Sequence, residues 1–168
     1  MSQGKYYIYH MIIRPYTAND KGACLEAFKS NMPEYFAAAE LPDFESWLDQ
    51  QAEQATPASA NITEQYYVIE KSSKVIGCGG YYINLTKRQA TMTWGLVNRA
   101  FHKQGIGKEL FQYRIAAIRE ICPACTIILD TSQYFLPFFQ KLGFGITKIS
   151  KDFYAKGIDR YDMELKKP

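Results

Sequence analysis

Residues 101–110 read FHKQGIGKEL and place two glycines, one residue apart, where a helix is expected to begin. A strand is predicted over 90–97, and apolar residues recur at helical spacing over 108–121. The first amide groups of a helix have no backbone acceptor, and the helix dipole makes them attractive to anions. Glycine allows the backbone to approach a ligand closely. This stretch therefore predicts an anion site, and a pyrophosphate fits it.

Two other phosphate-binding loops do not match this stretch. The sequence has no G-x-x-x-x-G-K-[ST], and Leu110 stands where the last glycine of G-x-G-x-x-G would be. Lys103 and Lys108 add positive charge to the loop. The alternative interpretation is a helix start at which the glycines only permit a tight turn.

The rest of the chain predicts one domain over residues 1–168 that mixes strands and helices. Strands are expected at 6–16, 65–71, 74–83, 90–97, 126–130, 144–150 and 159–165, and helices at 22–31, 43–54, 108–121 and 133–141. Residues 1–10 are interpreted as an N-terminal extension of the first strand. Glycines at 77, 79 and 80, inside a predicted strand, suggest a bulge or the close approach of another group.

Two motifs resemble the GNAT superfamily of acyl-CoA-dependent N-acetyltransferases. The first is HKQGIG at 102–107, similar to the [Q/R]-x-x-G-x-[G/A] signature that follows the fourth strand in that family. The second is LDTSQYFLPFFQKLGF at 129–144, a short strand followed by an aromatic-rich helix that ends in LGF. The resemblance implies an α/β (α+β) fold with a mixed, mostly antiparallel sheet of about seven strands. Four helices would flank this sheet, which would be splayed between strands 4 and 5.

The resemblance also implies where acetyl-CoA would bind as a cosubstrate. The backbones of Leu96 and Val97 would pair with the pantetheine arm, and the Val97 N–H would donate to the thioester oxygen. The other cofactor-binding residues that it implies are His102, Lys103, Gln104, Gly105, Ile106, Gly107, Lys108, Ser132, Phe135, Phe138 and Phe139. For the phenylalanines, plain core packing is the alternative interpretation.

The sequence departs from the family pattern at three positions. His102 replaces Gln or Arg, Ser132 replaces an Asn found in many members, and Phe139 replaces a Tyr that protonates the leaving thiolate. The usual general acid is therefore missing from its place. Tyr134, Tyr154 or water could take over that role.

The implied reaction is direct attack of a primary amine on the thioester in a ternary complex. It needs a base, because a free amine is mostly protonated at neutral pH. The candidates are Glu34, Glu70, His102 and Asp130, and Glu34 lies in the region that forms the acceptor side in this family. A solvated surface carboxylate is the alternative interpretation of Glu34.

Charge is unevenly distributed along the chain. Residues 30–70 contain eight Asp and Glu and no Lys or Arg, whereas the whole chain carries a net charge of +3. An acidic segment on the acceptor side suggests a small cationic amine or a peptide amine as acceptor, such as a polyamine or an aminoglycoside. The alternative is an acidic, solvated helix face.

Composition and charge indicate where the protein is expected to be located and which partners it is expected to have. No apolar run approaches the roughly 20 residues of a membrane span, and the N-terminus lacks the features of a secretory signal, so we expect a cytoplasmic protein without a membrane partner. Scattered Lys and Arg argue against a nucleic acid partner. A homodimer paired through strands is plausible. The rival function is a non-catalytic acyl-CoA-binding sensor or complex subunit with the same fold.

The four cysteines, at 24, 78, 122 and 125, are expected to be free thiols, because nothing in the sequence indicates export. Cys122 and Cys125 have C-x-x-C spacing, but they follow a helix and precede a strand, the reverse of the redox motif. Cys24 and Cys78 are not a second close pair, and zinc would need four ligands. We therefore expect no metal.

Overall fold

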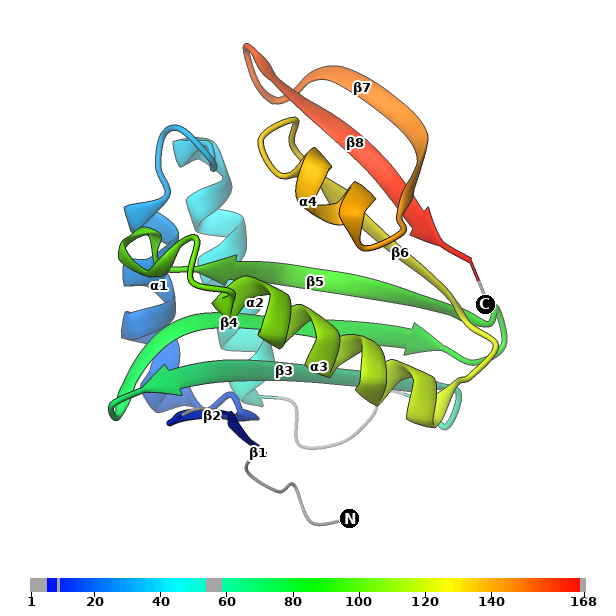
Figure 1. Ribbon diagram of the computed structural model, residues 1–168, viewed down its shortest axis with the longest axis horizontal. Coiled ribbons are helices and arrows are strands. Elements are labelled where there is room, and N and C mark those ends of the chain that lie inside the picture. Colours follow the sequence, from blue (N-terminus) through cyan, green and yellow to red (C-terminus); the bar gives the residue numbers. More distant parts are fainter. Residues whose placement is uncertain (1–5, 9, 54–58, 167–168) are drawn as a thin grey trace.

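Eight strands form one mixed sheet in the computed structural model, which describes residues 6–8, 10–53 and 59–166 (Figure 1). They are β1 (Tyr6–Ile8), β2 (Met11–Pro15), β3 (Ile62–Lys71), β4 (Lys74–Asn84), β5 (Gln89–Val97), β6 (Thr126–Thr131), β7 (Gly145–Ala155) and β8 (Ile158–Leu165). Their order across the sheet is β1-β2-β3-β4-β5-β6-β8-β7. Among these strands only β5 and β6 are parallel neighbours, which confirms the predicted mixed and mostly antiparallel sheet.

Four helices cover the two faces of the sheet, as predicted. They are α1 (Lys21–Ser30), α2 (Leu41–Glu53), α3 (Ile106–Ile121) and α4 (Leu136–Lys141), with 3-10 turns η1 (Ala18–Asp20), η2 (Ala38–Glu40) and η3 (Arg99–Phe101). α1 and α2 lie on one face, and α3 and α4 lie on the other (Figure 1). Each face has its own buried cluster, built around Phe28 and Phe44 on the first and around Phe111 on the second. Within the described residues, no helix is both long and apolar enough to cross a membrane.

The N-terminal part of the sheet differs from the prediction of about seven strands. The predicted strand at 6–16 is divided at His10, which has a φ of 68°, so that β1 turns back and pairs antiparallel with β2. A left-handed residue breaks an extended strand because it reverses the direction of the chain. Residues 6–8 are therefore an eighth strand rather than a continuation of the first one. Residues 1–5 lie outside the described part of the chain.

The parallel pair β5 and β6 separates soon after it begins. Residues 89–91 of β5 pair with residues 126–128 of β6, and no later residue of either strand pairs with the other. β5 continues to Val97 without a strand neighbour on that side, and β6 turns toward β8. These are the fourth and fifth strands counted from β2, so the predicted splay is confirmed. The gap between them provides space for a ligand.

A bulge in β5 lies opposite Gly79, one of the glycines that interrupt a predicted strand. Leu96 pairs with Cys78 and Thr93 pairs with Gly80, so two residues of β5 oppose Gly79 alone. A Cβ atom at Gly79 would lie 2.9 Å from Cζ of Arg114, and one at Gly95 would lie 2.6 Å from its Nη2. The glycines are needed because the Arg114 guanidinium occupies the space that side chains would fill.

Two cysteines differ from the prediction of free thiols. Cys122 and Cys125 form a disulfide in the turn between α3 and β6, where their Cα atoms are 5.4 Å apart. The tight turn brings the two thiols together, which their positions in the sequence left open. Cys24 and Cys78 are free and buried.

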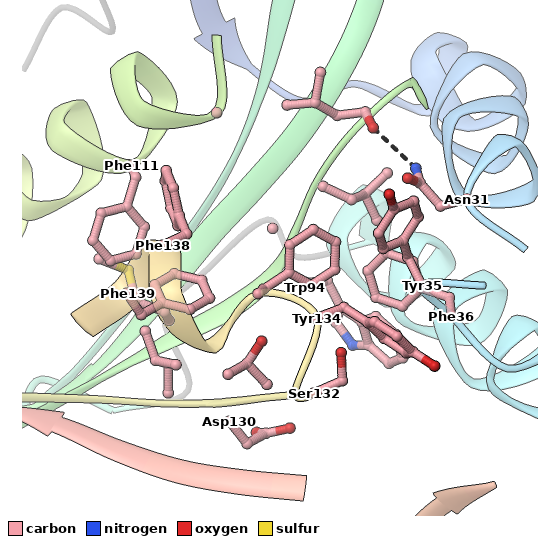
Figure 2. A pocket seen from close by; sticks show the side chains of 18 of the residues that line it. Asn31, Tyr35, Phe36, Trp94, Phe111, Asp130, Ser132, Tyr134, Phe138 and Phe139 are labelled. Atoms are coloured by element: carbon pink, nitrogen blue, oxygen red, sulfur yellow. Dashed lines mark hydrogen bonds between the residues drawn. The ribbon is translucent and has the colours of Figure 1, made fainter. Parts of the chain in front are cut away.

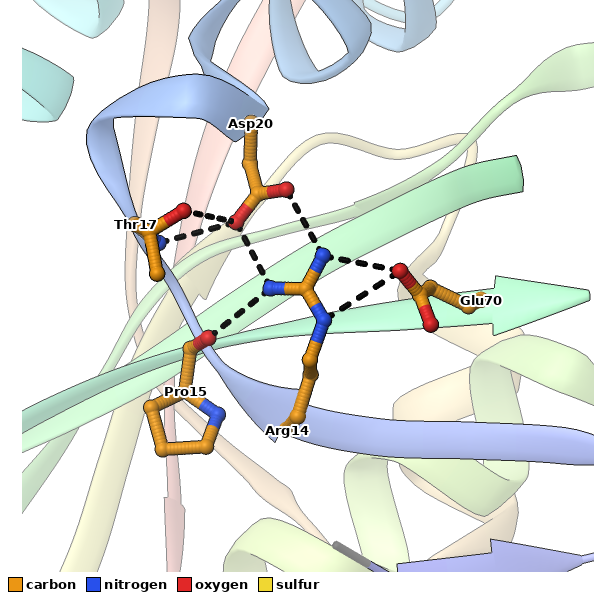
Figure 3. A network of polar contacts seen from close by, with 5 residues as sticks. All are labelled: Arg14, Pro15, Thr17, Asp20 and Glu70. Carbon is orange, nitrogen blue, oxygen red and sulfur yellow. Dashed lines mark hydrogen bonds and ion pairs between the residues drawn. The ribbon is translucent and has the colours of Figure 1, made fainter. Parts of the chain in front are cut away.

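Arg14 connects β2, β3 and η1 through two carboxylates (Figure 3). Its Nη1 and Nη2 each donate to Asp20 at 2.8 Å, and Nη2 also donates to Glu70 at 2.8 Å. Asp20 accepts a further bond of 2.8 Å from the N–H of Thr17. Burial alone would raise the pKa of Asp20, but the bonds from Arg14 and Thr17 outweigh it and hold this pKa below its ordinary value. The network fixes the turn from which α1 starts.

We expect Asp20→Asn to lower the free energy of unfolding by about 3 kcal/mol, because Arg14 loses a buried ionic partner. A carboxyl with a depressed pKa stabilises the fold above its unfolded pKa and loses that effect as the pH falls through the folded pKa. The difference between the variant and the wild type should therefore shrink below about pH 4. Urea denaturation at several pH values measures both effects.

Asp49→Asn is the matched control, because Asp49 pairs with Lys21 on the surface. It should leave the unfolding midpoint nearly unchanged. Equal losses in the two variants would contradict a special role for Asp20.

Candidate active site

A cavity of about 1070 Å³ lies where β5 and β6 separate. Its walls come from six parts of the chain: the segment from α1 to α2, the second half of β5, the start of α3, the end of β6, residues 134–141 and β7. The two arms of the splayed sheet thus share one cavity. Both predicted motifs, at 102–107 and 129–144, contribute to its walls.

The glycine loop forms the end of the cavity at α3. Gly105 has a φ of 79° and precedes Ile106, the first residue of the helix. The N–H of Glu109 donates to the Gly105 carbonyl at 3.0 Å and makes the first hydrogen bond of the helix. The N–H groups of residues 106–108 precede it and have no acceptor within the helix. A Cβ atom at Gly105 would meet nothing within 4 Å. An exposed helix start, a left-handed glycine and open space together suit an anion.

The last residue of β5 directs its backbone into the gap. The N–H of Asn98 donates to Ile76 at 2.7 Å, and Val97 is paired with Gly77. In an antiparallel ladder this alternation turns both polar groups of Val97 away from β4. Since β6 has already diverged, the Val97 N–H faces the space between the strands.

Two side chains hold the Val97 carbonyl in place. Asn31 Nδ2 donates to it at 2.9 Å (Figure 2), and His102 Nε2 bonds to it at 2.9 Å. Because a carbonyl only accepts, His102 must carry its proton on Nε2 in this arrangement. Asn31 is 1% exposed and also donates to the Ala27 carbonyl at 2.8 Å. The end of β5 is therefore fixed from two directions.

Carboxylates gather at the opposite end of the cavity. Glu40, Asp43 and Asp130 line it, and the hydroxyl of Tyr154 donates to Asp130. Burial raises the pKa of Glu40, and the negative charges of Asp130 and Asp43 raise it further. Burial, followed by the charge of Asp130, also raises the pKa of Tyr154. Asp130 and Asp43 therefore lie near enough to Glu40 to act on it, although Glu40 belongs to η2, Asp43 to α2 and Asp130 to β6.

Aromatic rings form the wall between the two ends (Figure 2). Tyr35 lies 5.9 Å from Tyr134 and 5.3 Å from Phe135, measured between ring centroids. Phe36 is 6.2 Å from Phe135, and Trp94 borders the same space. Such a wall suits apolar groups and cations equally.

Unsatisfied polar atoms concentrate in this cavity. Six buried side-chain atoms in the described part of the chain have no hydrogen-bond partner, and the residues of five of them line the cavity. The five atoms are Asn31 Oδ1, Trp47 Nε1, Thr93 Oγ1, Arg114 Nε and Ser132 Oγ. Buried polar atoms are rarely left without a partner, so their convergence indicates a site for a polar ligand or ordered water.

Arg114 is a buried cation that sequence reasoning missed. It is 5% exposed, donates to the Gly80 carbonyl at 3.1 Å and lies 5.4 Å from the Phe111 ring. Burial lowers its pKa to about 10. Its position within an otherwise amphipathic helix does not predict a buried cation. The sequence feature that reflects its position is the pair Gly79 and Gly95, at which a Cβ atom would meet the guanidinium.

Comparison with known proteins agrees with this geometry. Residues 26–167 match the family described as "Acetyltransferase (GNAT) domain". The chain belongs to the GNAT acetyltransferase family. No protein of curated function matches it significantly.

Solved structures of GNAT proteins share the fold along nearly their whole length. A GNAT-family protein from Desulfovibrio desulfuricans has a TM-score of 0.74 at 17% identity, with 94% of this chain and 99% of that chain covered. The ribosomal-protein-S18-alanine N-acetyltransferase of Escherichia coli has a TM-score of 0.67 at 16% identity, with 94% of each chain covered. The ribosomal-protein-S5-alanine acetyltransferase of Vibrio fischeri has a TM-score of 0.72 at 14% identity, with 98% and 97% covered.

Most predicted site residues of this GNAT chain are brought together around the cavity. Those that line it are Leu96, Val97, His102, Lys103, Gly105, Ile106, Gly107, Ser132, Tyr134, Phe135, Phe138 and Phe139. Gln104 and Lys108 do not line it, and the Gln104 side chain accepts a bond of 3.3 Å from Lys71. The His102 ring is directed at the Val97 carbonyl. Phe139 packs against Phe111, with ring centroids 5.3 Å apart, and has no proton to give.

Two predicted proton acceptors are engaged elsewhere. Glu34 does not line the cavity and forms an ion pair of 2.5 Å with Arg99 on the surface. Glu70, on β3, forms an ion pair of 2.8 Å with Arg14 on the neighbouring strand β2. Neither carboxylate enters the reaction proposed below. Asn31 is a polar residue of the cavity that the sequence did not single out, because it is an isolated residue in a helical context. Glu40 was noted only as one of the acidic residues of the 30–70 segment.

We expect Asn31→Leu to lower the free energy of unfolding by about 1–3 kcal/mol, because it removes one donor from the Val97 carbonyl and one from the Ala27 carbonyl. Chemical denaturation measures the change. Gln112→Leu makes the same exchange of an amide for Leu at an exposed position of α3 and should be nearly neutral. Unchanged stability of Asn31→Leu would show that the bond to Val97 is not made in solution.

Proposed function

We propose that this GNAT chain transfers the acetyl group of acetyl-CoA to a primary amine, by direct attack in a ternary complex. The observation that carries the proposal is the pairing of two features in one cavity: an anion-binding helix start at Gly105 and a free, inward-facing N–H at Val97. The first suits a pyrophosphate, and the second suits a carbonyl oxygen that gains negative charge.

The residues present fit acetyl-CoA as cosubstrate. Open space at Gly105 leaves room for phosphates against the amides of residues 106–108. The gap beyond Thr91 offers the edge of β5, through the backbone of Val97, to an extended arm, and Leu96 also lines the cavity. Lys103 lines the same end and adds positive charge. The cosubstrate, when bound, would supply an activated thioester.

The chain's own groups would act on the reaction through position and charge. Asn31 and His102 hold the Val97 carbonyl and so fix the end of β5, which orients the Val97 N–H before the substrate arrives. Preorganised donors stabilise developing charge without reorganising during the reaction. Phe139 cannot protonate the leaving thiolate, and we assign that proton to Tyr134 or to water in the cavity. A thiolate with a pKa near about 8.5 needs only modest help.

The acceptor in this proposal is a cationic amine. The cavity is electrically divided: Lys103, Arg114 and Lys141 line the part near α3 and α4, whereas Glu40, Asp43 and Asp130 line the opposite part. An anionic cosubstrate and a cationic acceptor would therefore approach from different ends. The acidic residues 40 and 43 belong to the segment without Lys or Arg that the sequence already marked. Some related enzymes carry names that specify ribosomal-protein alanine as acceptor, which is also an amine.

Gly105→Glu should weaken coenzyme A binding by about tenfold or more, measured by isothermal titration calorimetry. The new carboxylate would meet the phosphates, and the positive φ of 79° disfavours any side chain. Gly157→Glu is a closely matched control, because Gly157 also has a positive φ, of 81°, and open space around its Cβ, but it lies in the β7–β8 turn. The affinity of the Gly157→Glu variant for coenzyme A should equal that of the wild type.

Release of free coenzyme A in the presence of an amine library separates the enzyme from the non-catalytic alternative. A sensor would bind acetyl-CoA without turnover. Absence of coenzyme A binding by the wild type, in contrast, would reject the proposed function altogether.

A further inference from the structure

The acidic end of the cavity carries more negative charge than one reacting amine neutralises. Glu40, Asp43 and Asp130 line it. Among the described residues, the basic group within 4 Å of Asp130 is Arg160, whose Nη2 lies 3.8 Å from Asp130 and 2.7 Å from Asp162. Arg160 is therefore shared and closer to Asp162. An excess of negative charge remains available to a ligand.

A buried hydroxyl provides independent support for a ligand at this end. Ser132 is 5% exposed and lines the cavity two residues after Asp130, and its Oγ has no partner in the described part of the chain. Figure 2 shows this side chain between Asp130 and Tyr134, directed toward the aromatic wall. A hydroxyl oxygen can accept from an ammonium group. Polar donors of a ligand would satisfy both the hydroxyl and the carboxylates.

This acidic end is distant from the position of the reacting bond. β5 runs six residues from Thr91 to Val97, about 20 Å, whereas β6 runs two residues from the paired Ile128 to Asp130, about 7 Å. Val97 and Asp130 therefore lie on the order of 10 Å apart. Figure 2 agrees, because Asn31, which bonds to Val97, and Asp130 are at opposite ends of the view. A group at the acidic end cannot also be the nitrogen that attacks the thioester.

We propose that Glu40, Asp43 and Asp130 bind a second cationic nitrogen of the acceptor, on the order of 10 Å from the nitrogen that is acetylated. This inference rests on the proposed function and names its substrate class: an elongated amine with a positive charge at each end. The wall of Tyr35, Phe36, Trp94, Tyr134 and Phe135 would cover the apolar chain between the charges. A linear polyamine has this form, and so does a peptide with an N-terminal amine and a nearby Lys.

The test compares acceptors with and without positive charge beyond the reacting amine. Transfer from acetyl-CoA is measured with spermidine, with n-heptylamine, and with short peptides that carry Lys or norleucine at the second position. We expect kcat/KM for spermidine to exceed that for n-heptylamine by about tenfold or more, mainly through KM. The peptide pair distinguishes a peptide acceptor from a free polyamine.

The double variant Glu40→Gln with Asp130→Asn removes charge but keeps hydrogen bonding. Its amide oxygens can still accept from the Ala37 N–H, which bonds to Glu40 at 2.9 Å, and from the Tyr154 hydroxyl. The variant should lose the preference for the polyamine over n-heptylamine and keep the wild-type affinity for coenzyme A. Glu45→Gln, in the same acidic segment but paired with Lys21, is the control and should keep the preference.

Direct binding makes the test independent of turnover. Equilibrium dialysis should show that spermidine binds to the wild type and that its affinity for the double variant is about tenfold lower. Equal kcat/KM for the mono- and polyamine, or equal dialysis of variant and wild type, would overturn the distal site while leaving acetyl transfer intact. Failure to bind coenzyme A would instead contradict the proposed function. The dialysis result alone would then show whether the cation site exists.

Discussion

The proposed function depends on an interruption in the hydrogen bonding of the sheet. β5 and β6 pair over residues 89–91 and 126–128 and then separate, so that the polar edge of β5 has no neighbouring strand. An unpaired edge is ordinarily a liability that proteins cover or twist away. Here the edge borders a cavity of about 1070 Å³. A ligand with its own extended polar backbone can take the place of the absent strand.

The separation alone would leave the end of β5 poorly fixed, and side chains from distant parts of the sequence compensate. Asn31 reaches it from the end of α1 and His102 from the loop before α3. Their shared target is the carbonyl of Val97, and the N–H of the same residue faces the cavity. The end of β5 is thereby held through the acceptor of Val97, while the donor of this residue can serve a substrate. The same loop also provides the left-handed glycine that opens α3, so the two halves of the site are adjacent along the chain.

Patterns local in sequence predicted the fold and the segments that line the cavity near α3 and α4. The glycine loop, the apolar stripe of α3 and the aromatic helix at 136–141 are short-range signals, and each falls where expected. Features that depend on long-range contacts were not predictable. Asn31 is 66 residues from Val97, and the effect of Asp130 on Glu40 requires both arms of the sheet to be in place. The left-handed residue His10 and the disulfide of Cys122 and Cys125 were missed because both depend on the geometry of a turn.

The guanidinium of Arg114 couples three positions that lie on three different elements. Gly79 and Gly95 have no room for a methyl group while Arg114 is present, and a shorter residue at 114 would leave a void that the two glycines cannot fill. Replacement of any one of the three residues alone therefore lowers the stability of the fold, whereas simultaneous replacement of all three need not. Sequences that diverge from this chain would be expected to change the three positions as a set, so their joint identity would mark which relatives retain the same architecture behind the bulge.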